Sequence, residues 1–153
     1  MSFLEIGAGI GFVGIVTASL GHRVTITDYN EDALNFIHAN ALKNLREDEI
    51  KRVKVKKCDW NRPDLDEKYD YIIGSDVIFR EEDFEPILSL FDRYLKEDGE
   101  IILSEGIRKS SLKFLEFLDK GYNVKAIKKI LRSKDGEIPV ILIKAKRAPL
   151  GAL

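Results

Sequence analysis

A glycine-rich run near the start of the chain, Gly7-Ala8-Gly9-Ile10-Gly11, follows the short apolar run 3–6 and precedes a helical stretch. Glycines between a strand and a helix let the backbone pass close to a ligand, because no Cβ atom stands in the way. Asp28 closes the next β-branched run, where a carboxylate can accept hydrogen bonds from ribose hydroxyls. A tight turn or a helix-capping carboxylate would explain either feature alone. Together they predict a nucleotide-binding loop.

The glycines by themselves leave two cofactor classes open. Gly9-Ile10-Gly11-Phe12-Val13-Gly14 satisfies the G-x-G-x-x-G fingerprint, so a small NAD-dependent oxidoreductase is one alternative. Glu5 before the glycines, and Asp59-Trp60 and Ser75-Asp76 after later strands, argue against that alternative. A dehydrogenase would also need a substrate domain, for which a chain of 153 residues leaves little room.

Strands and helices alternate along the chain and would position these residues. From hydrophobic periodicity we expect strands over 3–6, 24–27, 52–57, 69–74 and 100–104, and helices over 12–20, 31–45, 81–96 and 110–120. Asn30 is the expected N-cap of the second helix, and Gly99 the expected stop of the third. The runs 122–131 and 138–146 flank the turn signal Lys134-Asp135-Gly136 and predict a β-hairpin.

This alternation predicts an α/β fold, a doubly wound and mostly parallel sheet with helices on both faces, to which the hairpin adds one antiparallel strand. We expect one domain over residues 1–147 and a fraying tail over 148–153. The connection 58–68 contains Pro63 and should be a loop with little helix.

Composition excludes several classes of function. The formal net charge of −1 provides no global attraction to nucleic acid or to an anionic membrane. No apolar run approaches the length of a membrane-spanning helix. Cys58 is the only cysteine, so no internal disulfide forms and a cytoplasmic location is expected. With His22 and His38 as the only histidines, there are too few ligands for a zinc site, and we expect no metal.

Several motifs together resemble a known family. The run from Glu5 to Gly11 is similar to the first motif of class I S-adenosylmethionine-dependent methyltransferases. The stretch 11–28, the pair Asp59-Trp60, and the run 69–79 followed by 81–86 resemble the seven-β-strand protein-lysine methyltransferases in particular. The resemblance covers nearly the whole chain, from Phe3 to about Lys146. It implies a Rossmann-like sheet of order 3-2-1-4-5-7-6 with strand 7 antiparallel, and methylation of a protein lysine or another amine.

The resemblance also implies roles for individual residues. Gly7, Ala8, Gly9 and Gly11 would face the methionine part and the ribose of S-adenosylmethionine, with Glu5 supporting the loop. Asp28 would hold the ribose hydroxyls, and Tyr29 would lie near the adenine. Asp59 would accept a hydrogen bond from the adenine amino group while Trp60 packs beside the ring. Ser75 would line the pocket close to the reacting methyl group.

The run Asp76-Val77-Ile78-Phe79 matches the D-x-x-Y/F pattern of the lysine branch. A tyrosine hydroxyl could accept a hydrogen bond from an incoming amine, whereas Phe79 cannot. Asp76 would therefore orient the amine alone, or the substrate is different. The N-P-P-Y/F motif that resembles nucleic-acid adenine and glutamine methyltransferases is absent, which disfavours those substrates.

Two groups of basic residues lie on the strands expected at the two edges of the sheet, around 51–57 and 125–132. Lysines on edge strands discourage aggregation, and we prefer that explanation to RNA binding because no stacking aromatics are interleaved. Family members carry a helix before the first strand, and this chain begins at that strand. We therefore expect an uncovered apolar sheet face and a homodimer, and we keep a cofactor-binding module with little catalysis as an alternative.

Overall fold

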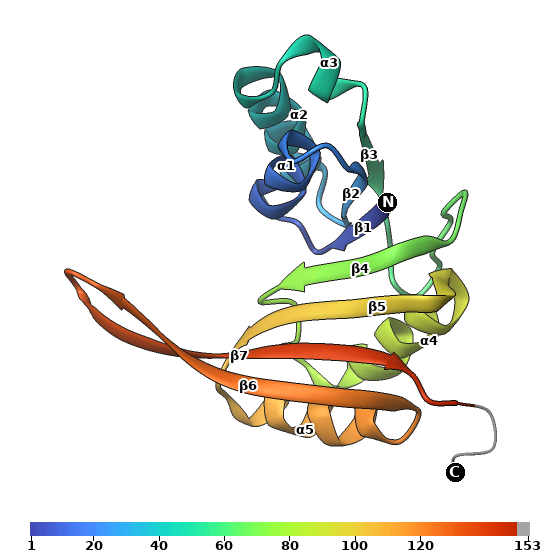
Figure 1. The fold of residues 1–153 in the computed structure, drawn as a ribbon, viewed down its shortest axis with the longest axis vertical. Coiled ribbons are helices and arrows are strands. Elements are labelled where there is room, and N and C mark those ends of the chain that lie inside the picture. Colours follow the sequence, from blue (N-terminus) through green and yellow to red (C-terminus); the bar gives the residue numbers. More distant parts are fainter. Residues whose placement is uncertain (150–153) are drawn as a thin grey trace.

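Seven strands form one mixed sheet in the computed structural model, which describes residues 1–149 (Figure 1). Their order is β3-β2-β1-β4-β5-β7-β6, which confirms the prediction. Only β7 is antiparallel to its neighbours, β5 and β6. The strands are β1 (Ser2–Ile6), β2 (Arg23–Asp28), β3 (Val53–Lys57), β4 (Tyr69–Ser75), β5 (Leu95–Gly106), β6 (Tyr122–Ser133) and β7 (Gly136–Arg147). Insertion of β7 between β5 and β6 distinguishes this sheet from the 3-2-1-4-5-6 order of dinucleotide-binding domains.

Helices follow most of the parallel strands. They are α1 (Phe12–Ser19), α2 (Glu31–Asn44), α3 (Glu47–Ile50), the 3-10 turn η1 (Glu81–Asp83), α4 (Phe84–Tyr94) and α5 (Lys109–Asp119). As predicted, Asn30 caps α2, because its side chain accepts hydrogen bonds from the backbone N–H groups of Asp32 and Ala33. The single turn α3 was not predicted. It is too short to show a hydrophobic period.

The prediction of one long helix over 81–96 is wrong at both ends. Residues 81–83 form only the 3-10 turn, and the α-helix ends at Tyr94 because Leu95 is extended, fully buried and paired with Tyr69. Gly99 is therefore not a helix stop. It lies within β5, where a Cβ atom would come within 2.6 Å of the Leu95 side chain and 3.0 Å of the Asp70 carbonyl oxygen. The glycine admits close contact between β4 and β5.

The sheet carries helices on both faces, each covering a different half (Figure 1). On one face α1 and α2 cover the β1–β3 half, with a core that includes Ile15, Ile26 and Ile37. On the opposite face α4 and α5 cover the larger core, in which Phe91 and Phe114 are fully buried.

The connection between β3 and β4 and the C-terminal tail can be compared with the predictions. Residues 58–68 contain no helix, as predicted. Of the expected tail 148–153, residues 150–153 lie outside the described residues. Within residues 1–149, no helix has both the length and the apolar composition needed to cross a membrane.

The strand order reverses direction at β1 and β4, which lie side by side in parallel. Ile6 pairs with Gly74, so the loops that leave these two strands start at the same level of the sheet. In open α/β sheets, ligands bind in the crevice outside the carboxyl ends of the strands at such a switch point. The topology therefore places the glycine loop after β1 beside Ser75 and Asp76 at the end of β4.

Candidate active site

The glycine loop adopts a conformation that only glycine accepts readily. Gly7, Gly9 and Gly11 have φ angles of 55°, 59° and 79°, in the left-handed region. A Cβ atom on Gly7 would come within 2.7 Å of the Val77 side chain, so β1 and the β4 loop could not approach as they do. Apart from Gly9 itself and its two chain neighbours, no heavy atom lies within 4 Å of the Cβ position of Gly9. The backbone at Gly9 thus faces open space that a ligand can enter.

Asp28 ties this loop to the end of β2. Its carboxylate accepts hydrogen bonds from the backbone N–H of Gly9 at 2.9 Å and from that of Asn30 at 2.9 Å. Ala8 adds a backbone bond, donating to the carbonyl oxygen of Thr27 at 3.0 Å. A carboxylate has about four acceptor positions, so Asp28 keeps capacity for donors from a ligand. Asp28 therefore organises the loop as well as facing the site.

A cavity of ≈ 390 Å³ opens beside the loop. Its lining residues are Gly7, Asp28, Tyr29, Cys58, Asp59, Trp60, Asn61, Arg80 and Asp83. Five of these are site residues predicted from the sequence, contributed by the end of β2 and by the loops after β1, β2 and β3. Ala8, Gly9 and Gly11 continue the same loop but do not line this cavity.

The wall formed by the loops after β2 and β3 combines flat rings with a carboxylate. Trp60 is half-buried against the core, and its ring lies 3.4 Å from the Cβ position of Gly7. Tyr29 is exposed, with the Lys57 ammonium 5.7 Å from its ring centroid. Asp59 accepts a hydrogen bond from the backbone N–H of Asn61 at 2.9 Å, which holds the turn. This wall suits a planar base that carries a hydrogen-bond donor.

Arg80 and Asp83 line the cavity and were not predicted. The Arg80 guanidinium donates two hydrogen bonds to the Asp83 carboxylate, at 3.0 and 3.1 Å. The paired geometry makes this a bidentate contact that fixes the cavity rim. In the sequence Arg80 lies just before the helix expected over 81–96, and Asp83 lies in the run 81–86 that carries part of the family resemblance. Neither residue was assigned a role in the site.

Glu5 lies beneath the loop and does not line the cavity. Its side chain is buried and accepts a hydrogen bond from the backbone N–H of Gly14 at 2.8 Å. Burial raises the pKa of Glu5 to about 7. The hydrogen bond from the Gly14 N–H lowers this pKa, and the negative charge of Asp28 raises it further. Gly14, the last glycine of the G-x-G-x-x-G pattern, makes room for this carboxylate, because a Cβ atom there would contact Glu5 and Ile26.

The pKa of Glu5 predicts a pH-dependent stability. In the folded state the group binds its proton up to about pH 7, whereas an exposed glutamate loses it near pH 4.5. The contribution of Glu5 to stability is therefore fully present below pH 4.5 and is lost as the pH rises through 7, by on the order of 3 kcal/mol. Urea unfolding of wild type and Glu5→Gln at pH 5 and pH 8 measures it. The difference in unfolding free energy between the two proteins should change with pH, and a constant difference would contradict the assignment.

Asp76 sits at a sharp corner after β4. It is the one non-glycine residue of the described chain with a positive φ, 50°, a conformation that aspartate tolerates better than most residues. One carboxylate oxygen accepts from the backbone N–H of Gly106 at 2.9 Å and lies 3.4 Å from the Arg108 guanidinium. Its side chain remains 59% exposed. The carboxylate is thus held in place and still accessible.

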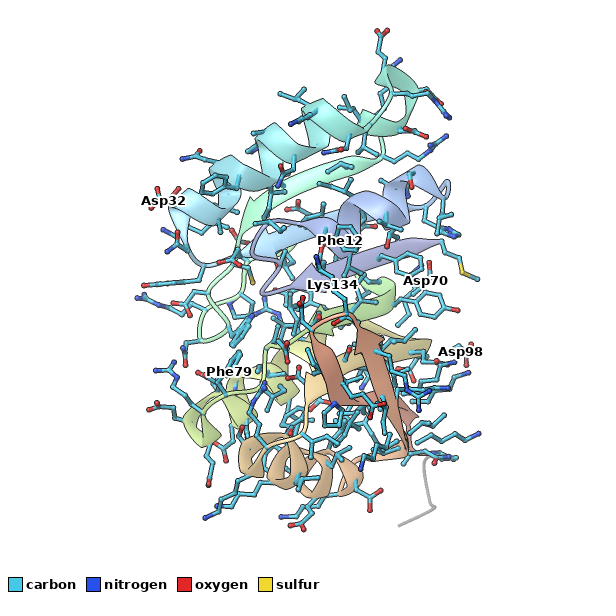
Figure 2. All side chains as sticks on the ribbon, turned by 90° about the vertical axis from the view of Figure 1, so that its left-hand side faces the viewer. Phe12, Asp32, Asp70, Phe79, Asp98 and Lys134 are labelled. Carbon is cyan, nitrogen blue, oxygen red and sulfur yellow. The ribbon has the colours of Figure 1, made fainter. Side chains whose placement is uncertain are left out.

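Arg108 connects this corner to Phe79. Its guanidinium carbon lies 4.2 Å from the Phe79 ring centroid, and its Nη2 donates to the Ile78 carbonyl oxygen at 3.2 Å. Phe79 is 58% exposed and is labelled in Figure 2. A cation over an aromatic face is a favourable contact. The aromatic residue of the D-x-x-Y/F pattern therefore stacks with an arginine at the surface of the site.

Glu105 fastens the same loop from below. It is fully buried and accepts from the backbone N–H groups of Val77 at 2.9 Å and Ile78 at 3.3 Å, and from Arg108 at 3.0 Å. Burial raises the pKa of Glu105 above its usual range, opposed by these donors. Neither Glu105 nor Arg108 was predicted. The period of two along β5, with Ile101 and Leu103 buried, was the signal that Glu105 faces inward.

Ser75, by contrast, has no side-chain hydrogen bond in the described structure. It is exposed at the end of β4, where it pairs with Ser104 of β5. The predicted residues thus form two groups: the cavity with its glycine loop, and a corner made of Asp76, Phe79 and Arg108. Arg80, which follows Phe79 in the chain, lines the cavity.

The sequence is similar to a family of known proteins. A model of the lysine methyltransferase family matches residues 1–121. Protein N-lysine methyltransferase METTL21A of Xenopus tropicalis is 40% identical over 109 residues, which are 70% of this chain and 50% of that protein. The METTL21A of Danio rerio is 38% identical over 128 residues, 81% of this chain and 58% of that protein. The chain thus spans between half and three-fifths of the length of these relatives.

Solved structures share the fold. A precorrin-6y C5,15-methyltransferase from Geobacter metallireducens has a TM-score of 0.77 at 24% identity, over 97% of this chain and 80% of that chain. The glycopeptide N-methyltransferase MtfA has a TM-score of 0.81 at 16% identity, over 97% of this chain and 89% of that chain. At such identities the likeness shows the fold, and the family match carries the relationship. The chain belongs to the lysine methyltransferase family.

Proposed function

We propose that this protein is an S-adenosylmethionine-dependent methyltransferase that modifies a lysine amine of a protein. The observation that carries the proposal is the cavity beside the glycine loop, with Asp28 and Asp59 as acceptors and Tyr29 and Trp60 as flat walls. Carboxylates suit the hydroxyl and amino donors of an adenosine, and aromatic rings suit its base. The open space at Gly9 and the cavity of ≈ 390 Å³ provide room for a ligand of this class.

When bound, S-adenosylmethionine supplies an electrophilic methyl group on a sulfonium. The chain has to position the acceptor in line with it, and positioning provides most of the rate in such a displacement. Asp76 is the group that can orient an amine, because its carboxylate is fixed by Gly106 and still exposed. Arg108 beside it offsets the negative charge, which would otherwise favour the unreactive ammonium form.

Lysine is the acceptor that the relatives favour, although one relative points elsewhere. The METTL21A proteins are named as N-lysine methyltransferases, whereas a Dictyostelium discoideum protein, 34% identical over 142 residues, is named a histidine protein methyltransferase. The D-x-x-F corner, in which the exposed Asp76 carboxylate can orient an amine, supports lysine. Mass spectrometry of the methylated residue distinguishes the two acceptors.

Calorimetric titration tests the cofactor directly. We expect S-adenosylmethionine and S-adenosylhomocysteine to bind and NAD not to bind. Binding of NAD alone would refute the proposal and restore the dehydrogenase alternative. Binding of S-adenosylmethionine without methyl transfer to any lysine would support the cofactor-binding module instead.

We also propose a homodimer. On the sheet face opposite α4 and α5, the β4–β5–β7 half carries no helix in the described structure, and Tyr71, Ile102 and Leu142 are only half-buried there (Figure 1). Covering such apolar surface favours association. Light scattering at micromolar concentration should give twice the chain mass of 17.4 kDa. A monomer at that concentration would contradict the prediction.

The proposed location is the cytoplasm. Cys58, the only cysteine, is buried, and burial raises the pKa of its thiol to about 11. The thiol therefore stays protonated, which makes it a poor nucleophile despite its place in the cavity wall. A chain without disulfides is typical of a reducing compartment.

A further inference from the structure

The terminal hairpin extends well past the rest of the sheet (Figure 1). Pairing of β5 with β7 ends at Gly106 and Val140, whereas pairing of β6 with β7 continues to Ser133 and Gly136. Residues 130–139 therefore have only each other as strand neighbours. We call this segment the hairpin arm.

The arm leaves the sheet beside the acceptor corner. Gly106, level with the base of the arm, is the residue whose N–H donates to the Asp76 carboxylate at 2.9 Å. Arg108, which lies 3.4 Å from that carboxylate, follows two residues later. Because β6 runs parallel to β5, the arm projects in the direction of the carboxyl ends of the strands. Its tip, marked by Lys134, lies toward the viewer in Figure 2.

Large aliphatic side chains on and next to the arm are exposed to solvent. Ile130, Leu131 and Ile138 are 49%, 55% and 60% exposed, and Ile127 at its base is 55% exposed. Leu131 lies opposite Ile138, and opposite residues of an antiparallel pair share a face. A two-stranded ribbon alone is marginally stable in water, so its apolar face gains from being covered.

The hairpin and the rest of the chain carry net charges of opposite sign. Residues 122–147 hold eight of the 25 basic side chains and only two of the 26 acidic ones. The hairpin therefore carries a net charge of +6 and the rest of the chain −7. Lysines that only protect an edge strand would not explain aliphatic residues exposed among them. A surface of this kind is complementary to a partner that is both acidic and aliphatic.

We propose that the hairpin arm docks an acidic, aliphatic segment of the protein substrate next to the acceptor lysine. This inference rests on the proposed function for the identity of the partner as substrate. Single-stranded RNA fits less well, because the only aromatic residue of 122–147 is Tyr122, which is buried. A second copy packing arm against arm would oppose two charges of +6.

Fluorescence anisotropy with three synthetic peptides tests the docking. Each peptide has one lysine and the same leucines, and its remaining positions are glutamate, glutamine or arginine. We expect the glutamate peptide to bind wild type best, with an affinity that falls as salt is added. The triple variant Lys128→Glu, Lys129→Glu and Lys134→Glu should weaken that binding at least about tenfold, as should Leu131→Ser with Ile138→Ser.

A matched control changes the same net charge elsewhere. Lys43→Glu, Lys51→Glu and Lys68→Glu alter three exposed lysines away from the arm and should leave peptide affinity within about threefold. Equal loss in both triple variants, equal binding of the glutamine peptide, preferential binding of an RNA oligonucleotide, or a dimer that buries the arm would each overturn the proposal. Calorimetry with S-adenosylmethionine is run on every variant. Peptide docking without cofactor binding would refute the proposed function and leave the arm as an interaction site.

Discussion

Replacing Asp28 by alanine should weaken S-adenosylmethionine binding by at least about 100-fold, equivalent to roughly 2.7 kcal/mol. Two losses combine in this variant. The cavity loses the carboxylate that faces it, and the glycine loop loses the hydrogen bonds that Asp28 accepts from Gly9 and Asn30. Isothermal titration calorimetry of wild type and Asp28→Ala measures the effect. The large effect is expected because this one substitution removes both a ligand contact and the hydrogen bonds that hold the glycine loop.

One further variant separates the two losses, and another serves as a control. Asp28→Asn keeps one oxygen acceptor for the Gly9 N–H and removes the charge, so its affinity should lie between wild type and alanine. Asp32→Ala removes an exposed carboxylate four residues later, at the start of α2, and should leave the affinity within about threefold. If Asp28→Ala itself binds S-adenosylmethionine within about threefold of wild type, the assigned role of Asp28 is wrong.

Replacing Asp76 by asparagine should lower the turnover rate by roughly 100-fold while the affinity for S-adenosylmethionine stays within about threefold. Asparagine keeps an oxygen for the Gly106 N–H and tolerates the left-handed backbone, so the corner should keep its shape. It loses the charge that orients the acceptor amine and pairs with Arg108. Single-turnover methylation and calorimetry on the same preparation measure the two quantities.

The controls for Asp76 address fold and charge. Asp64→Asn neutralises an exposed carboxylate in the 58–68 loop and should leave both quantities unchanged. Arg108→Met should also reduce turnover, because the Asp76–Phe79 corner loses its clamp and Glu105 is left buried without its cation. Parallel loss of affinity and turnover in Asp76→Asn would show that Asp76 supports the cofactor cavity rather than the acceptor.

Much of the fold was readable because local signals agreed with one another. The first two apolar runs ended at Gly7 and Asp28 and were each followed by a helical period, and the Lys134-Asp135-Gly136 turn predicted the hairpin. The error in the predicted bounds of the helix over 81–96 has a physical cause. The helical period continues through Leu95, but burial of that side chain and its pairing with β4 favour an extended backbone there. Tertiary packing overrides local propensity at such a boundary.

The sequence by itself determined the glycine loop, the carboxylate of Asp28 at a strand end and the motifs that indicate the family, because each rests on residue types at short spacing. Only the tertiary structure decided which of them face one cavity, and it separated Gly7, Asp28 and Trp60 from the Asp76 corner. It also revealed Glu105 and Arg108, whose partners lie about thirty positions away in the chain. Contacts between separate strand ends depend on strand order and register, and these arise when the sheet assembles rather than from any local pattern.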